Sequence, residues 1–306
     1  ERLVLAISAE TGVSIEAENT LIIFDEIQEV PKALTSLKYF HENAPQYAIV
    51  AAGSLLGVAL HQGTSFPVGK VDFLDLYPLN FREFLCAMGE KQFVSMLDSC
   101  DTQMVTVFKT KYIERLREYY FVGGMPEVVK DFSEKKDYNR VRAIQKNLIN
   151  YYQQDFSKHA EIKLVPRLNL VWNSIPMQLA KENKKYIYGQ VREGSRAKDF
   201  ELAIQWLLDC GLIHKVQRIQ KPDLPLKAYI DFDAFKLFLV DIGLLIAMTD
   251  LDAKVIIEGN KIFTEFKGAL TEQYILQQLI SDVGVIPYYY STQNSKGEID
   301  FLVQGK

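Results

Sequence analysis

The chain has 306 residues, of which 48% are hydrophobic and 12% aromatic, and this is enough apolar material for the cores of two or three domains. It carries 35 Lys and Arg side chains against 39 Asp and Glu, a formal net charge of −4. The composition excludes a disordered or collagen-like chain, and the charge excludes a protein held to nucleic acid or an anionic membrane by its overall field. Any such contact must come from a local patch.

The sequence shows no signal for membrane insertion or secretion. The mostly apolar stretch Tyr47 to Leu60 contains two glycines and is shorter than the roughly 20 residues that span a bilayer. Three cysteines, Cys86, Cys100 and Cys210, are odd in number and lack CxxC spacing, which favours a reducing compartment. We expect a cytoplasmic protein that does not contact a membrane, and a segment of a longer chain, because both ends resemble interior positions.

A strand, a helix and a second strand are predicted near the N-terminus. The apolar run Leu21 to Phe24 is typical of a parallel strand buried on both faces. Pro31 begins a helix with an apolar face, and a second apolar run, Ala48 to Ala52, follows it. This order predicts a right-handed βαβ unit.

Three polar side chains follow the two strands: Asp25 and Glu26 after the first, and Ser54 after the second. In a parallel sheet these positions share the carboxyl edge, where ligands bind. Four apolar residues followed by Asp-Glu form a Walker B pattern, in which the Asp holds the Mg²⁺ shell and the Glu polarises the water that attacks the γ-phosphate. The alternative is that Asp25 and Glu26 are ordinary loop residues and that Ser54 only forms a turn.

No phosphate-binding loop accompanies this pattern. The stretch Gly63 to Val71 has five residues between its glycines where the motif has four, and Val71 replaces the Ser or Thr that binds Mg²⁺. We expect Lys70 to be a solvated residue at the start of a strand over Val68 to Leu76; the alternative is that it faces the nucleotide. Without such a loop, this segment should bind ATP weakly or not at all.

The rest of the chain is predicted to be helical first and mixed afterwards. Asn80 and Glu83 have the spacing of a helix N-cap and its partner, and Phe84 to Lys181 reads as a series of helices. A helix over Ala197 to Asp209 and two strands, Leu212 to Val216 and Leu226 to Ile230, are typical of a winged helix. The four histidines of the chain lack partners at metal-ligand spacing and are expected in loops or on the surface.

The predicted winged helix is locally basic, with nine basic against five acidic side chains between Lys181 and Lys221. A winged helix can place its second helix in the major groove and its wing on the phosphate backbone. Double-stranded DNA is therefore one candidate partner, and docking onto a protein is the alternative. The candidate phosphate contacts are Arg192, Arg196, Lys198, Lys215, Arg218 and Lys221.

Five motifs occur in an order that resembles prokaryotic AAA-type ATPases with a C-terminal DUF4143-type domain of PD-(D/E)XK nuclease-like fold. The motifs are Leu21 to Gln28, Ala51 to Ser54, Leu79 to Leu85, Gly123 to Glu127 and Glu298 to Phe301. The resemblance implies an α/β protein with a parallel-sheet P-loop NTPase-type core over 1–85, a helical subdomain over 86–180, a winged helix over 181–250 and an incomplete nuclease-like α/β domain over 251–306. It also implies a phosphate-binding loop upstream of this segment.

The resemblance implies ATP and Mg²⁺ as ligands. Asp25 would hold Mg²⁺ through water, Glu26 would be the hydrolytic base, and Ser54 would sense the γ-phosphate. In the C-terminal domain, Glu272 and Asp300 would match two carboxylates of a nuclease metal site, although each could also be an exposed surface residue. The expected function is an ATPase module coupled to the C-terminal region. The alternatives are a nucleotide-independent DNA-binding or protein-docking regulator, and a metal-dependent nuclease.

Overall fold

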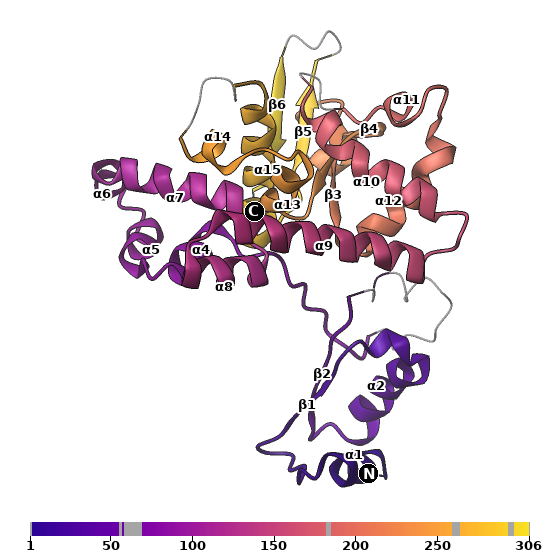
Figure 1. Ribbon diagram of the computed structural model, residues 1–306. Helices are drawn as coiled ribbons and strands as arrows, with labels where there is room; N and C mark the ends of the chain where they lie inside the picture. Colours follow the sequence, from indigo (N-terminus) through magenta and orange to yellow (C-terminus); the bar gives the residue numbers. More distant parts are fainter. Residues whose placement is uncertain are drawn as a thin grey trace. The chain divides into compact units, whose positions relative to one another are not determined.

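The computed structural model describes residues 2–54, 57, 69–181, 185–258, 264–292 and 297–305. The chain forms two compact units, unit 1 with residues Glu1–Leu76 and Asp209–Gly211, and unit 2 with Tyr77–Leu208 and Leu212–Lys306. The fold is mixed α/β, with a small parallel sheet in unit 1 and a mixed sheet in unit 2 (Figure 1). In the part of the chain that the structure describes, no helix is both long and apolar enough to cross a membrane.

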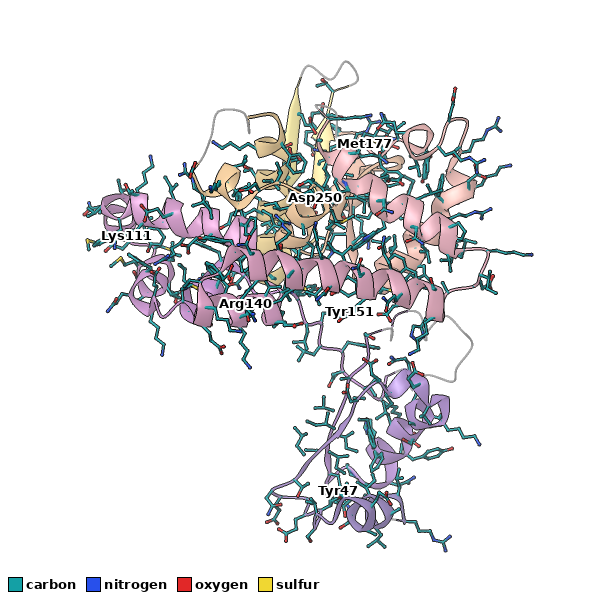
Figure 2. The ribbon with its side chains drawn as sticks, viewed as in Figure 1. Tyr47, Lys111, Arg140, Tyr151, Met177 and Asp250 are labelled. Carbon is teal, nitrogen blue, oxygen red and sulfur yellow. The ribbon has the colours of Figure 1, made fainter. Side chains whose placement is uncertain are left out.

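Unit 1 confirms the predicted parallel βαβ arrangement. Strands β1 (Leu21–Phe24) and β2 (Ala48–Ala51) pair in parallel, and η1 (Ile27–Glu29) and α2 (Pro31–Asn43) connect them. Helix α2 begins at a proline, whose missing N–H costs nothing in the first turn. Val4 of α1 (Arg2–Thr11) forms a small core with Phe40 and Ala44, against which Tyr47 packs (Figure 2).

Two expectations for unit 1 are wrong. Among the described residues, helices cover one face of the sheet and not the other: Ile22 is buried, whereas Leu21 and Ile23 on the opposite face are 52% and 62% exposed. The strand expected over Val68 to Leu76 is also absent from its described part, since residues 69–76 adopt neither helix nor strand. Leu74 and Leu76 are largely exposed there. The described part of this stretch pairs with no strand, and its apolar residues are therefore not buried in a sheet.

Unit 2 confirms the helical region expected between Phe84 and Lys181. Asn80 caps the first of its helices as predicted: its side chain accepts a hydrogen bond from the Glu83 amide at 2.9 Å, and the Glu83 carboxylate accepts one from the Asn80 amide at 2.8 Å. Arg140, at the start of the longest helix in this region, binds Asp131 of the preceding helix (Figure 2). The helices from Phe81 onwards are α4 (Phe81–Ala87), α5 (Lys91–Asp98), α6 (Thr102–Val107), α7 (Lys109–Val122), α8 (Pro126–Lys135), α9 (Tyr138–His159), α10 (Val165–Leu179), α11 (Tyr188–Val191), α12 (Ala197–Asp209), α13 (Ile242–Met248), α14 (Ala253–Ile257) and α15 (Thr264–Ser281).

The mixed sheet of unit 2 has the strand order β4-β3-β5-β6. Its strands are β3 (Ile213–Ile219), β4 (Ile230–Leu239), β5 (Tyr288–Ser291) and β6 (Glu298–Leu302). The predicted hairpin is present, but its second strand begins only at Ile230, because Leu226–Tyr229 form the short helix η2. Strand β3 also pairs in parallel with β5, so the strands expected as a wing share one sheet with the C-terminal strands.

A buried carboxylate explains the glycine pair at the end of α7. Asp241 is fully buried and accepts hydrogen bonds from the amides of Gly124 at 2.6 Å and Leu244 at 3.0 Å, and from Gln277 Nε2 at 3.1 Å. Burial raises the pKa of Asp241, and these hydrogen bonds oppose the increase. A Cβ on Gly123 would lie 2.2 Å from Asp241 Oδ1. The Asp241 carboxylate therefore leaves no room for a side chain at Gly123.

Candidate functional site

The structure brings together two of the three polar residues predicted at the strand tips of unit 1. The Ser54 amide and hydroxyl both donate to Glu26 Oε2, at 3.3 and 3.1 Å. The sheet pairing continues past both strands, since the Ala52 amide donates to the Phe24 carbonyl at 2.8 Å and the Ile27 amide to the Ala52 carbonyl at 3.0 Å. These backbone bonds fix the two tips side by side.

The backbone at Glu26 has an unusual conformation. Its φ of 46° and ψ of 46° lie in the left-handed region, which costs a residue with a Cβ about 1 kcal/mol or more. Glu26 thereby turns away from the strand direction, and its carboxylate accepts hydrogen bonds from Ser54 and from Gln28 Nε2. Such strained positions are concentrated at functional sites.

Asp25 lies beside this pair and is exposed. Its Oδ1 accepts a hydrogen bond from the Glu26 amide at 3.0 Å. The tip therefore presents two exposed carboxylates and a hydroxyl, and oxygen ligands of this kind suit Mg²⁺, which keeps several waters and takes one or two carboxylates. The residues present fit a magnesium ion held through water.

The stretch rejected as a phosphate-binding loop lies mostly outside the described residues. Of its members, Lys70 is described, and its ammonium group lies 3.6 Å from the Glu42 carboxylate. Both side chains are more than one-third exposed, so the pair contributes little stability. Lys70 is a surface residue, as the sequence predicted.

Comparison with protein families gives two matches. Residues 2–85 match the model of the AAA domain, and residues 113–255 match a domain of unknown function, DUF8612. The first match supports an AAA-type domain over the part of the chain that holds β1, β2 and their tips. The second differs from the DUF4143-type domain that the resemblance implied, and its description names neither a nuclease nor a winged helix. Neither the curated proteins nor the solved structures give a match.

The AAA match and the βαβ geometry point to the same class, an ATPase-type module that binds nucleotide. The matched region includes the parallel strands, the acidic tip and the capping box of α4. Each family match covers less than half of the chain, so the class applies to this region and not to the rest of the protein.

A second group of charged residues lies in unit 2 and includes the carboxylates predicted as a nuclease-like metal site. Glu272 Oε2 and Asp300 Oδ1 lie 3.1 and 3.5 Å from the same atom, Lys236 Nζ, and Glu298 Oε1 lies 2.6 Å from it. The structure thus brings Glu272 and Asp300 together around a lysine. Within the described ranges, no three His, Cys, Asp or Glu side chains are grouped so as to hold a metal ion.

The interpretation of the sequence did not include Lys236. The only signal available was a single charged residue within the otherwise apolar run Phe235 to Leu239. A lysine in such a run is almost never fully buried unless it is paired. The signal therefore indicates a buried ion pair, but the partners lie 36 or more residues away and could not be assigned without the fold.

The six predicted nucleic-acid contacts fall into two groups of three. Arg192, Arg196 and Lys198 are exposed around the start of α12. The three on the hairpin already have partners within unit 2: Arg218 binds Asp231, Lys221 binds Asp223, and Lys215 lies 4.3 Å from the centre of the Phe235 ring. A phosphate contact by these three would compete with interactions that are already formed.

Proposed function

We propose that unit 1 belongs to the Mg-ATP-binding and hydrolysing part of an AAA-type ATPase. The observation that carries the proposal is the contact between the Glu26 carboxylate and the Ser54 hydroxyl at adjacent strand tips. A carboxylate and a hydroxyl held side by side can bind one water together and orient it towards a phosphate placed at the carboxyl edge of the sheet. The AAA match over residues 2–85 supports the assignment.

Each of the three residues has a separate role. Asp25 holds Mg²⁺ through water, Glu26 accepts the proton of the attacking water, and Ser54 senses the γ-phosphate. The ion supplies charge stabilisation for the transferred phosphoryl group. Glu26 gains its orientation from the left-handed backbone and from the hydrogen bonds of Ser54 and Gln28.

The test is Mg²⁺-dependent binding of a fluorescent ATP analogue to the full-length protein. Asp25→Ala should weaken binding in Mg²⁺ and leave binding in EDTA unchanged, because only the ion-mediated part is removed. Glu18→Gln is the matched control, since Glu18 is exposed and precedes β1 at the opposite end of the strand. If Asp25→Ala bound the analogue in Mg²⁺ as tightly as wild type, Asp25 would have no part in holding the ion.

Duplex DNA is the partner that we propose for unit 2, through the exposed cations Arg192, Arg196 and Lys198. The experiment measures duplex binding as a function of salt concentration. Arg192→Ala with Arg196→Ala should weaken binding and reduce the salt slope by roughly one for each lost phosphate contact. Arg218→Ala should leave the slope unchanged, because Arg218 is bound to Asp231. No duplex binding by the full-length protein at low salt would rule out this partner and favour a protein partner.

A further inference from the structure

A lysine is buried at the centre of the carboxylate group in unit 2. The side chain of Lys236 is 1% exposed, and its ammonium group lies 4.8 Å from the centre of the buried Tyr289 ring. Its three carboxylate partners come from two other elements: Glu272 from α15, and Glu298 and Asp300 from β6. Lys236 itself belongs to β4, so one ammonium group connects three elements that are far apart in the sequence. We call these four residues the Lys236 cluster.

The electrostatics of the Lys236 cluster keep the lysine charged. Burial alone would lower the pKa of Lys236, but the charges of Glu272 and Glu298 and their hydrogen bonds raise it above its ordinary value. A buried ammonium group is stable only when it is paired and hydrogen-bonded, and Lys236 has a carboxylate oxygen for each of its three protons within 3.5 Å. The ammonium group is therefore fully coordinated.

The Lys236 cluster is partly open to solvent, so solvent access alone does not exclude a dissolved cation from it. A surface pocket lined by Lys267, Thr271 and Ile275 also has Glu272 and Asp300 in its wall. Asp300 and Glu298 are 54% and 36% exposed. A dissolved ion can thus reach these two carboxylates, but Glu272 is 6% exposed and faces the ammonium group.

We infer that Lys236 is the resident cation of this cluster: its ammonium group lies between the three carboxylates and ties β4 to α15 and β6 without a metal. This inference is independent of the nucleotide proposal for unit 1. A divalent ion could bind all three carboxylates only by displacing the ammonium group of Lys236. The cluster is consequently a structural cross-link and not a site of metal-dependent hydrolysis.

The experiment compares thermal unfolding of unit 2 in Mn²⁺, in Ca²⁺ and in EDTA. Tryptophan fluorescence reports on this unit, since the two tryptophans of the chain, Trp172 and Trp206, both lie in it. The variants are Lys236→Met, Glu272→Gln and, as a control, Lys215→Met, which removes a partly buried lysine of the same sheet from outside the cluster. Titration calorimetry with Mn²⁺ measures ion binding to the wild-type chain and to Glu272→Gln.

The wild-type Tm should be the same in all three solutions. Lys236→Met should lower Tm by roughly 6 °C or more in EDTA, because it removes the positive charge beside the buried Glu272 carboxylate, and Mn²⁺ should recover part of that loss by replacing the ammonium charge. Two results would overturn the inference: Mn²⁺ binding to the wild-type chain that Glu272→Gln abolishes, or a Lys236→Met protein as stable as Lys215→Met. The calorimetric comparison of the wild-type chain with Glu272→Gln tests the inference even if Lys236→Met does not fold.

Discussion

Asp241→Ala should be among the most destabilising single substitutions in unit 2. The Asp241 carboxylate is fully buried and accepts hydrogen bonds from the amides of Gly124 and Leu244 and from Gln277 Nε2. Its removal leaves three buried donors without an acceptor, and each unsatisfied donor costs roughly 1 to 3 kcal/mol. Taking the lower bound for each, we expect a loss of about 3 kcal/mol in the free energy of unfolding.

The matched control is Asp137→Ala, because both aspartates cap a helix and differ in burial. Asp137 caps α9 by accepting hydrogen bonds from the amides of Asn139 and Arg140, in a position open to solvent. Water can replace these bonds, so the control should lose only about 1 kcal/mol. Urea denaturation followed by tryptophan fluorescence measures both variants in unit 2. A difference below about 0.5 kcal/mol between the two variants, within ordinary surface scatter, would refute the argument that the buried donors depend on Asp241.

Two further substitutions test other parts of unit 2. Gly124→Ala should cost roughly 1 to 3 kcal/mol by overpacking, because its Cβ would lie 2.1 Å from the Leu79 carbonyl oxygen; the same urea experiment checks this, and wild-type stability would contradict the close approach. His214 lies in β3 and not in a loop or on the surface as expected, and burial lowers its pKa to about 4, whereas an unfolded histidine titrates near 6.5. As the pH falls from 7.5 to 5, the unfolded state therefore binds a proton that the folded state does not, and about 2 kcal/mol of stability is lost. His214→Phe should remove that part of the acid sensitivity, and an unchanged dependence of the urea midpoint on pH would exclude His214 as its source.

The sequence predicted the local elements well where a short-range pattern determines them. Leu21–Phe24 and Ala48–Ala51 are strands because of their apolar runs, and Asn80 with Glu83 forms a capping box because both hydrogen bonds close within one turn. The contact between Glu26 and Ser54 at the strand tips could also be predicted, since parallel pairing brings the ends of neighbouring strands together. Neither the composition nor the residue spacing predicts the left-handed backbone of Glu26.

Long-range pairings could not be predicted in the same way. The hairpin of β3 and β4 resembles a wing locally, and only the pairing of β3 with β5, about 70 residues further on, makes it part of a larger sheet. The Lys236 cluster depends on three elements whose positions are set by that sheet. Arg218 looked free in the sequence for the same reason: Asp231 lies 13 residues from Arg218, and the register that joins them is a property of the folded chain.

ATP hydrolysis by the full-length protein, wild type against Glu26→Gln, tests the central claim most directly. The substitution keeps the size of the side chain and its ability to accept a hydrogen bond from Ser54, but it removes the base. The account predicts that Glu26→Gln binds Mg-ATP as wild type does and loses turnover. Hydrolysis by Glu26→Gln at the wild-type rate would contradict the assignment of Glu26 as the base, and with it the function proposed for the strand tips.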